Sequence, residues 1–293
     1  MNFSQPTADF FVPDGASAAA ALARTTHLAV GAHQDDVEFM AVQGVLECFG
    51  RPERPFGSVV VTNGAGSARI GPYAGVSNEE MCRLRRLEQR AAATIGQYSF
   101  AAQLDFTSAE AKTPGSPAVV ADLQALFRAA RVRAVYTHNL ADKHETHVAV
   151  GLAVIAALRG LPRDRRPEKL YGCEVWRDLD WMPDNEKVVF DVSARQNLQA
   201  ALGGVFDSQI AGGKRYDLAS AGRRRANATF LESHAADKTE MAAFAMDLTP
   251  LIADDTLDII GYVAGCIQRF EADVRRKLAA RLAGGAAAAG RPG

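Results

Sequence analysis

Leu28-Ala-Val-Gly-Ala-His-Gln-Asp-Asp36 is a short apolar run that ends abruptly in one imidazole and two carboxylates, those of His33, Asp35 and Asp36. A run of this kind, bounded by polar residues, is typical of a buried strand. Such a strand delivers its terminal side chains to one edge of a sheet. Imidazole nitrogen and carboxylate oxygen are both zinc ligands in proteins.

A second segment repeats this arrangement. Arg133-Ala-Val-Tyr-Thr-His138 predicts another strand, and the pair His144 and His147 follows it. In doubly wound sheets ligands bind outside the carboxyl ends of the strands, so we expect both polar clusters at the same edge.

Between residues 27 and 160, apolar runs alternate with helical patterns, as in βαβ units. Strands are predicted at 27–32, 58–62, 104–106 and 133–138, and helices at 40–49, 78–95, 118–130 and 146–158. This alternation predicts an α/β fold with a doubly wound, mostly parallel, Rossmann-like sheet and helices on both faces.

Beyond residue 160 the alternation weakens into a mixed, α-rich C-terminal extension. Strands are predicted at 169–176 and 188–192, a helix at 194–206, a pocket-shaping loop at 212–236, and a long amphipathic helix at 256–282. The apolar side of that last helix suits packing on the domain or on a second copy of the chain. We expect one domain over residues 1–283, with a core at 27–160, a mixed part at 161–283 and a disordered tail at 284–293.

Composition excludes several classes of partner. The formal net charge of -1 gives no attraction to nucleic acid or anionic membrane. No apolar stretch approaches the roughly 20 residues that span a bilayer. The four cysteines form neither a CxxC pair nor a dense framework, which favours a reducing, cytoplasmic location. The expected partner is a small molecule.

The two clusters together predict a catalytic zinc site. His33 and Asp36 are three residues apart at a turn, and His147 lies at a second position on the same edge, so the three predict one ligand set with an open position for water. Asp35 points elsewhere and is free to accept a proton from the activated water. His144 is placed to hydrogen-bond a substrate carbonyl or to protonate a leaving amine. These roles amount to hydrolysis of an amide.

Each feature also has a purely structural interpretation. Asp35 and Asp36 at the start of a helix commonly cap it, and an H-x-x-H spacing recurs by chance. His138 is either a substrate contact or a hydrogen-bonded structural histidine. Trp176 and Trp181 either line a sugar pocket or pack in the core or at a subunit contact. The coincidence of two clusters at one predicted edge favours the metal site.

The motifs resemble those of the PIG-L, or LmbE-like, zinc-dependent N-deacetylases. Ala32-His-Gln-Asp-Asp-Val-Glu38 resembles the family's A-H-P-D-D-x-E signature, and Asp142-Lys-His-Glu-Thr-His147 resembles its D-x-H-x-D-H motif. Arg85-Arg-Leu-Glu88 and Phe206-Asp-Ser-Gln209 are similar to its R-x-x-E helix and S-Q segment. The resemblance spans about residues 27–210.

This resemblance implies one zinc ion per chain and a small N-acylated substrate, most often an N-acetyl amino sugar or a sugar-linked secondary metabolite. The residues that it assigns are zinc ligands His33, Asp36 and His147, general base Asp35, His144 as stabiliser of the tetrahedral intermediate, and Arg85 as a substrate contact.

The chain departs from the family pattern at three places. Gln34 stands where proline is common, Thr146 replaces the aspartate before the last histidine, and residues 107–110 replace an acid that often follows the third strand. The carboxylate that orients His144 is therefore missing, and Asp142 or Glu145 is left to take its role. The alternative function is a non-catalytic relative that binds a metal or a carbohydrate.

Overall fold

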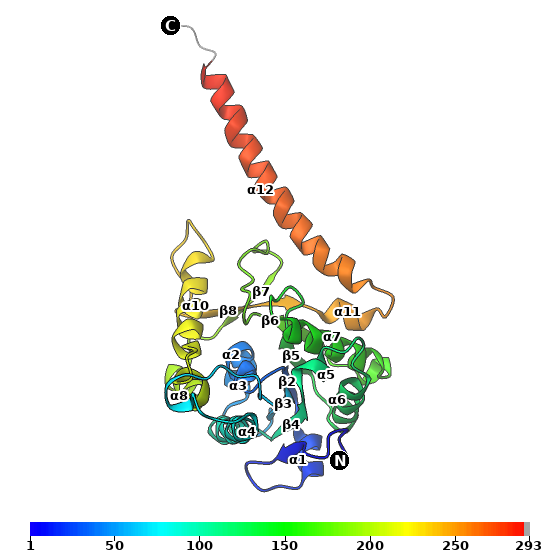
Figure 1. Ribbon diagram of the computed structural model, residues 1–293. Coiled ribbons are helices and arrows are strands. Elements are labelled where there is room, and N and C mark those ends of the chain that lie inside the picture. The colour runs from blue at the N-terminus through cyan, green and yellow to red at the C-terminus, as the bar shows by residue number, and fades with distance from the viewer. Residues whose placement is uncertain (290–293) are drawn as a thin grey trace.

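The computed structural model describes residues 1–289, with side chains through residue 283 (Figure 1). The strands are β1 (Asp9–Phe11), β2 (His27–Gly31), β3 (Phe56–Thr62), β4 (Phe100–Phe106), β5 (Ala134–His138), β6 (Lys169–Cys173), β7 (Lys187–Asp191) and β8 (Ala242–Asp247). The α-helices are α1 (Ala18–Arg24), α2 (Asp36–Met40), α3 (Val42–Cys48), α4 (Asn78–Ile95), α5 (Ser108–Ala111), α6 (Pro117–Ala129), α7 (Glu145–Arg159), α8 (Gln196–Gly204), α9 (Asp207–Ile210), α10 (Tyr216–Phe230), α11 (Thr249–Ala253) and α12 (Ile259–Ala289).

The eight strands form one sheet in the order β1-β4-β3-β2-β5-β6-β8-β7. The five strands from β4 to β6 run parallel to one another. By contrast, β1 is antiparallel to β4, and β8 is antiparallel to both β6 and β7. The predicted α/β fold with a mostly parallel sheet is confirmed.

Helices cover both faces of the sheet, as the alternation of β2 side chains illustrates. Leu28 and Val30 join a buried cluster with residues of α6 and α7 on one face. Ala29 points to the other face, into a cluster with residues of α3, α4 and α8. A fully buried aliphatic side chain stabilises the fold by about 1.5–3 kcal/mol, so continuous apolar strands of this kind hold the sheet at the centre of the domain.

The direction of the winding reverses between β2 and β5. From β2 the chain adds β3 and β4 on one side of the sheet, and then returns to add β5 and β6 on the other. Such a switch point leaves a crevice at the carboxyl ends of the two central strands. The segments that follow β2 and β5 are the two that contain the histidine and aspartate clusters.

The fold differs from the sequence predictions in several places before α12, and three of them lie near the histidine and aspartate clusters or in the C-terminal part. The helix predicted at 40–49 is present as α3, and a short helix that was not predicted, α2, precedes it, with Ala41 between the two. Residues 212–236 were expected to loop, but they contain α10, whose buried positions include Arg224 and Asn227. The strand β8 was not predicted, because Ala-Ala-Phe-Ala-Met-Asp lacks the β-branched residues that indicate a strand. It forms because β6 and β7 hydrogen-bond to it on both sides.

Helix α12 begins on the body of the domain and then projects away from it (Figure 1). In its first turns Cys266 is buried, and the Tyr262 hydroxyl donates to the carbonyl oxygen of Asp247 at 2.6 Å. The helix continues to Ala289, into the segment 284–293 that we expected to be disordered, which agrees with the high helix propensity of its alanines. Residues 290–293 lie outside the described residues.

Among the described residues, no helix combines the length and the apolar character that crossing a bilayer requires. All four cysteines are free, without disulfide bonds.

Candidate active site

The turn after β2 brings His33 and Asp36 to one point. Asp35, the residue before α2, has a φ of 93°, in the left-handed region that aspartate tolerates better than most residues. Gly31 is needed just before the turn, because a Cβ there would lie 3.0 Å from the Cβ of Asp36. The local backbone therefore folds tightly enough for the two side chains to meet.

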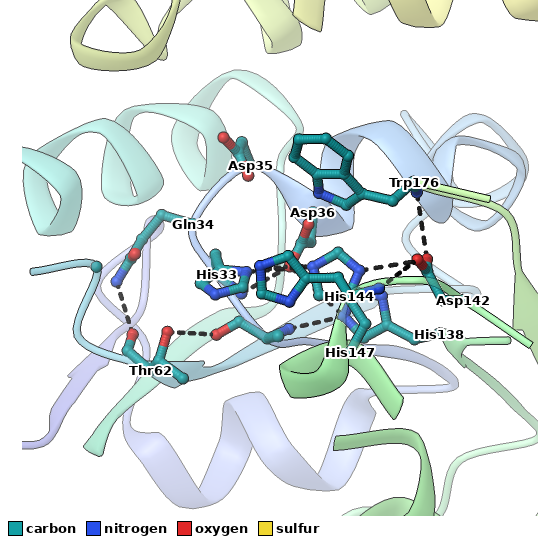
Figure 2. Close-up of polar contacts among 12 residues, drawn as sticks. His33, Gln34, Asp35, Asp36, Thr62, His138, Asp142, His144, His147 and Trp176 are labelled. Atoms are coloured by element: carbon teal, nitrogen blue, oxygen red, sulfur yellow. Dashed lines mark hydrogen bonds and ion pairs between the residues drawn. The ribbon is translucent and has the colours of Figure 1, made fainter. Parts of the chain in front are cut away.

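Gln34 holds this turn against the neighbouring strands. Its Nε2 donates to the carbonyl oxygen of Thr62 at 3.0 Å, at the end of β3 (Figure 2). The same Nε2 donates to Oε1 of Gln103 in β4 at 3.2 Å. The side chain is buried. These bonds explain how the turn forms without the proline that the family carries there.

Three potential ligand atoms converge between the ends of β2 and β5 (Figure 2). His33 Nδ1 lies 3.2 Å from Asp36 Oδ2, His147 Nε2 lies 3.4 Å from the same oxygen, and the two nitrogens are 3.2 Å apart. Bonds of about 2.0–2.1 Å to a tetrahedral zinc ion place neighbouring ligand atoms about 3.3–3.4 Å apart. The three separations therefore fit the edges of one tetrahedral face.

Hydrogen bonds alone do not account for this triangle. Each imidazole nitrogen offers at most one proton and an ionised carboxylate offers none, so three contacts share at most two protons. Burial raises the pKa of Asp36, but the imidazoles of His147, His138 and His33 outweigh it and hold the pKa well below its usual range. A common cation satisfies all three atoms at once, so the donor set fits a metal ion.

Asp142 orients the most deeply buried member of the triangle. Its Oδ2 lies 3.4 Å from His147 Nδ1 and accepts from the backbone N–H of Trp176 at 3.2 Å, while its Oδ1 accepts from the backbone N–H of His144 at 3.1 Å (Figure 2). A carboxylate on the far nitrogen of a ligating histidine fixes its tautomer and ring orientation.

The carboxylates of Asp36 and Asp142 favour a positive charge on or beside His147. Burial lowers the pKa of this imidazole, but the carboxylates of Asp36 and Asp142 raise it above its ordinary value. Because either a proton or a metal cation meets that demand, the electrostatics of the cluster also suit a metal.

His138 lies beneath the triangle, not on the wall of a cavity. Its side chain is fully buried, and its ring stacks on His147 with centroids 3.9 Å apart. The backbone N–H of Ala32 donates to its Nε2 at 2.8 Å, so that nitrogen has no proton and its lone pair is already used. Although Asp36, His138 and His147 also have ligand atoms within 4.8 Å of one another, this geometry suits a structural support, not a ligand or the substrate contact suggested from the sequence.

Asp35 points away from the triangle, as expected, and forms an ion pair. Its Oδ2 lies 3.2 Å from Nη1 of Arg85, and both side chains are buried. Burial raises the pKa of Asp35 to about 7, even though the Arg85 guanidinium opposes the rise. We expected Arg85 to contact substrate, but its Nη1 donates to the carboxylate of Asp35.

His144 borders the triangle at the start of α7. Its ring centroid lies 5.0 Å from that of His33 and 4.5 Å from that of His147. Burial, together with the other two imidazoles, lowers the pKa of His144 to about 4, so the ring is neutral near pH 7. Neither Asp142 nor Glu145 holds its ring: the carboxylate of Asp142 meets only its backbone, and Glu145 pairs with Lys112. Its Nδ1 is buried without a hydrogen-bond partner.

A cavity of about 680 Å³ opens above this cluster. Its lining includes five of the catalytic, metal-ligand and substrate-contact residues predicted from the sequence: His33, Asp35, Asp36, Arg85 and His144. The opposite wall comes from Trp176, after β6, and from residues 214–224, mostly in α10. Residues 212–236 were expected to shape the pocket, but the sequence pointed to no particular side chain among them.

The sequence profile of the PIG-L family, described as GlcNAc-PI de-N-acetylase, matches residues 28–158. The matched segment begins in β2 and ends in α7, so it contains both clusters. Residues 28–158 therefore belong to the PIG-L family, as the motifs predicted. No match was found among curated protein sequences.

Solved structures share the fold at low sequence identity. The conserved protein TT1542 from Thermus thermophilus is 23% identical with a TM-score of 0.56, covering 75% of this chain and 93% of that one. N,N'-diacetylchitobiose deacetylase from Pyrococcus horikoshii is 14% identical with a TM-score of 0.56, covering 76% and 84%. The 4-carboxy-2-hydroxymuconate hydratase from Pseudomonas putida is 17% identical with a TM-score of 0.60, covering 77% and 96%. These likenesses show the fold, which hosts both a deacetylase and a hydratase.

Proposed function

We propose that this protein is a metal-dependent N-deacetylase that hydrolyses the acetyl amide of a small N-acetylated amine, most often an amino sugar or a sugar-linked metabolite. The observation that carries the proposal is the triangle of His33 Nδ1, Asp36 Oδ2 and His147 Nε2, with separations of 3.2–3.4 Å, inside a PIG-L segment. An open cavity directly above the triangle provides room for a substrate.

His33, Asp36 and His147 would hold the metal, for which the family resemblance implies zinc. Such a cation supplies Lewis-acid activation and lowers the pKa of water from about 15.7 to about 7. Asp142 keeps His147 in the tautomer whose Nε2 faces the site.

Asp35 is the proposed general base. Its carboxylate lines the cavity next to the ligand set without joining it, and its pKa of about 7 suits a group that accepts and then returns a proton near neutral pH. The ion pair with Arg85 fixes the direction of the carboxylate. We therefore assign Arg85 as the residue that positions the base.

His144 is the proposed donor to the oxygen of the substrate carbonyl. A neutral imidazole has one N–H, and a hydrogen bond aimed at the developing oxyanion stabilises the transition state more than the ground state. The ring borders both histidines of the ligand set and lines the cavity. Because Thr146 offers no carboxylate, its side chain supplies no acidic partner to orient this ring.

The test compares Asp35→Asn with the wild type for acetate release from a panel of N-acetylated sugars and amines. Loss of turnover with unchanged metal content and circular dichroism supports the proposal, since the amide keeps the size of the side chain but cannot accept the proton. Asp164→Asn, an exposed acid remote from the cavity, is the matched control. Full turnover by Asp35→Asn contradicts the base assignment. Binding of metal and sugar by the wild type without acetate release favours the alternative, a non-catalytic binding protein.

A further inference from the structure

The acidic groups that line the cavity are already committed. Asp36 belongs to the metal triangle, and Asp35 pairs with Arg85 at 3.2 Å. Glu174 is buried, and its Oε1 accepts from the backbone N–H of Phe244 at 3.1 Å. Asp35 and Asp36 are therefore unavailable to other cations of the cavity. Glu174 interacts through its charge with Arg223: burial raises the pKa of Glu174, and the charge of Arg223 opposes that rise.

Several cations of the same cavity, in contrast, have no described carboxylate within ion-pair distance. Lys143, Lys214 and Arg223 line it and form no ion pair within the part of the chain whose side chains are described. A fourth lining cation, Lys112, lies 3.6 Å from a carboxylate oxygen of Glu145, whose side chain is 85% exposed, so this pair is weak. The mouth of the cavity is therefore locally positive.

Lys214 occupies a defined position in the wall. Its Nζ lies 4.9 Å from the centroid of the Trp176 ring, in cation–π geometry, and Tyr216 packs edge-on against the same ring at 6.1 Å. On its other side, Trp176 lies 6.1 Å from the ring of His144. A substrate sugar ring that extends from His144 across the Trp176 ring would thus place its far end near Lys214.

In a strongly basic protein, lysines without an acidic partner would be expected around any cavity. This chain, however, has a formal net charge of -1. The lysines on the solvated surface are mostly paired: Lys169 with Asp247, Lys238 with Glu232, and Lys277 with Asp273. Lys143 and Lys214 differ from these three surface lysines, and their free charges suit a ligand that supplies negative charge.

We propose that the substrate carries an anionic group, a phosphate or a carboxylate, on the part of the molecule remote from the acylated nitrogen, where Lys214, Lys143 and Arg223 bind it. This inference rests on the proposed function for the position of the acyl group at the metal triangle. The binding of the anion itself does not require hydrolysis.

The binding experiment uses the full wild-type chain and its tryptophan fluorescence, because Trp176 is one of only two tryptophans. The probes are N-acetylglucosamine, N-acetylglucosamine 6-phosphate and N-acetylmuramic acid, which are neutral, phosphorylated and carboxylated. We expect at least one anionic sugar to bind about tenfold more tightly than the neutral one, and added salt to reduce the difference. The stronger of the two anionic sugars identifies the phosphate or the carboxylate.

Variants of Lys214 test whether this residue causes the preference for anionic sugars. Lys214→Met keeps an unbranched chain against Trp176 but removes the charge, and we expect it to reduce the ratio of anionic to neutral affinity about tenfold. Lys214→Arg should restore most of the ratio. Lys238→Met, which removes an exposed lysine outside the cavity, should leave the ratio at the wild-type value.

The outcomes separate this inference from the proposed function. Equal or undetectable binding of the three sugars, or a preference that survives in Lys214→Met, overturns the anionic substrate, even where acetate is released. A preference that depends on Lys214 without any acetate release supports the anion site while the deacetylase proposal fails.

Discussion

The floor of the cavity and its wall are built by different means. The floor, which we define as His33, Asp36 and His147, sits on the ends of β2 and β5, and its side chains hold one another in place. The wall, Trp176 and Lys214, comes from segments outside the parallel core, and both side chains are half-buried. The sheet topology therefore fixes the positions of the proposed metal ligands, whereas the residues of the wall can differ without moving them.

The largest effect is expected from breaking the floor. Asp36→Asn removes a ligand and the negative charge that attracts the cation, so we expect loss of bound metal and a decrease in acetate release of more than about 10³-fold. Metal content by mass spectrometry and acetate release on the same preparation check this. An Asp36→Asn protein that keeps its metal would show that the triangle is only a hydrogen-bonded cluster.

The support of the floor should matter less than its ligands. Asp142→Asn keeps the size of the side chain but weakens the acceptor for His147 Nδ1, so metal affinity should fall by about 10–100-fold. Competition with a chelating dye measures this affinity. An unchanged affinity would mean that the packing around His147 orients its ring without Asp142.

A change in the wall should leave the metal in place. Trp176→Ala removes the ring between His144 and Lys214, so we expect kcat/KM to fall about tenfold, mostly through KM, at unchanged metal content. Loss of metal in this variant would contradict the separation of floor from wall. Steady-state kinetics with a metal assay on each preparation decide between these outcomes.

The turn under the floor contributes to stability. Gln34→Ala leaves Thr62 O and Gln103 Oε1 without their shared donor in a buried site, so we expect the free energy of unfolding to fall by about 1–3 kcal/mol. Urea unfolding measures the change. A difference within error would indicate that water replaces the amide and that the turn does not depend on Gln34.

The smallest effect on the chemistry is expected from α12, far from both floor and wall. We propose that its exposed apolar side joins two copies of the chain, because Val274, Leu278 and Leu282 are 37%, 59% and 77% exposed. Leu278→Glu should lower the mass measured by light scattering, while Ala280→Glu, on the opposite side of the helix, should not. A wild type that is monomeric at all concentrations would rule out this contact.

The floor was predictable from sequence because its residues follow apolar runs whose strands meet at one edge of a parallel sheet. The order of the strands adds what periodicity cannot supply, namely that β2 and β5 are neighbours. Asp142 was recognised within its motif, but its actual partner, His147, depends on side-chain directions at the start of α7. The pairing of Arg85 with Asp35 likewise joins α4 to the turn before α2, which sequence spacing does not reveal.

The wall was not predictable to the same degree. Residues 212–236 are rich in glycine and arginine, a composition that favours a loop, yet most of them form α10, because Arg224 and Asn227 find buried hydrogen-bond partners. The helix α10 packs against β8, and the sequence of β8 does not indicate a strand. Because β8 was not predicted, the surface on which α10 packs was not predicted either. For Trp176 the sequence favoured core packing or a subunit contact over a sugar pocket, and only its neighbours in space place it in the cavity.

The central claim is that His33, Asp36 and His147 together hold the metal, and diffraction at the zinc absorption edge from crystals of the zinc-loaded protein tests it most directly. We predict one strong anomalous peak about 2.0–2.2 Å from His33 Nδ1, a carboxylate oxygen of Asp36 and His147 Nε2. A peak bound instead by His138 or His144, or no peak at this edge of the sheet, would contradict the account.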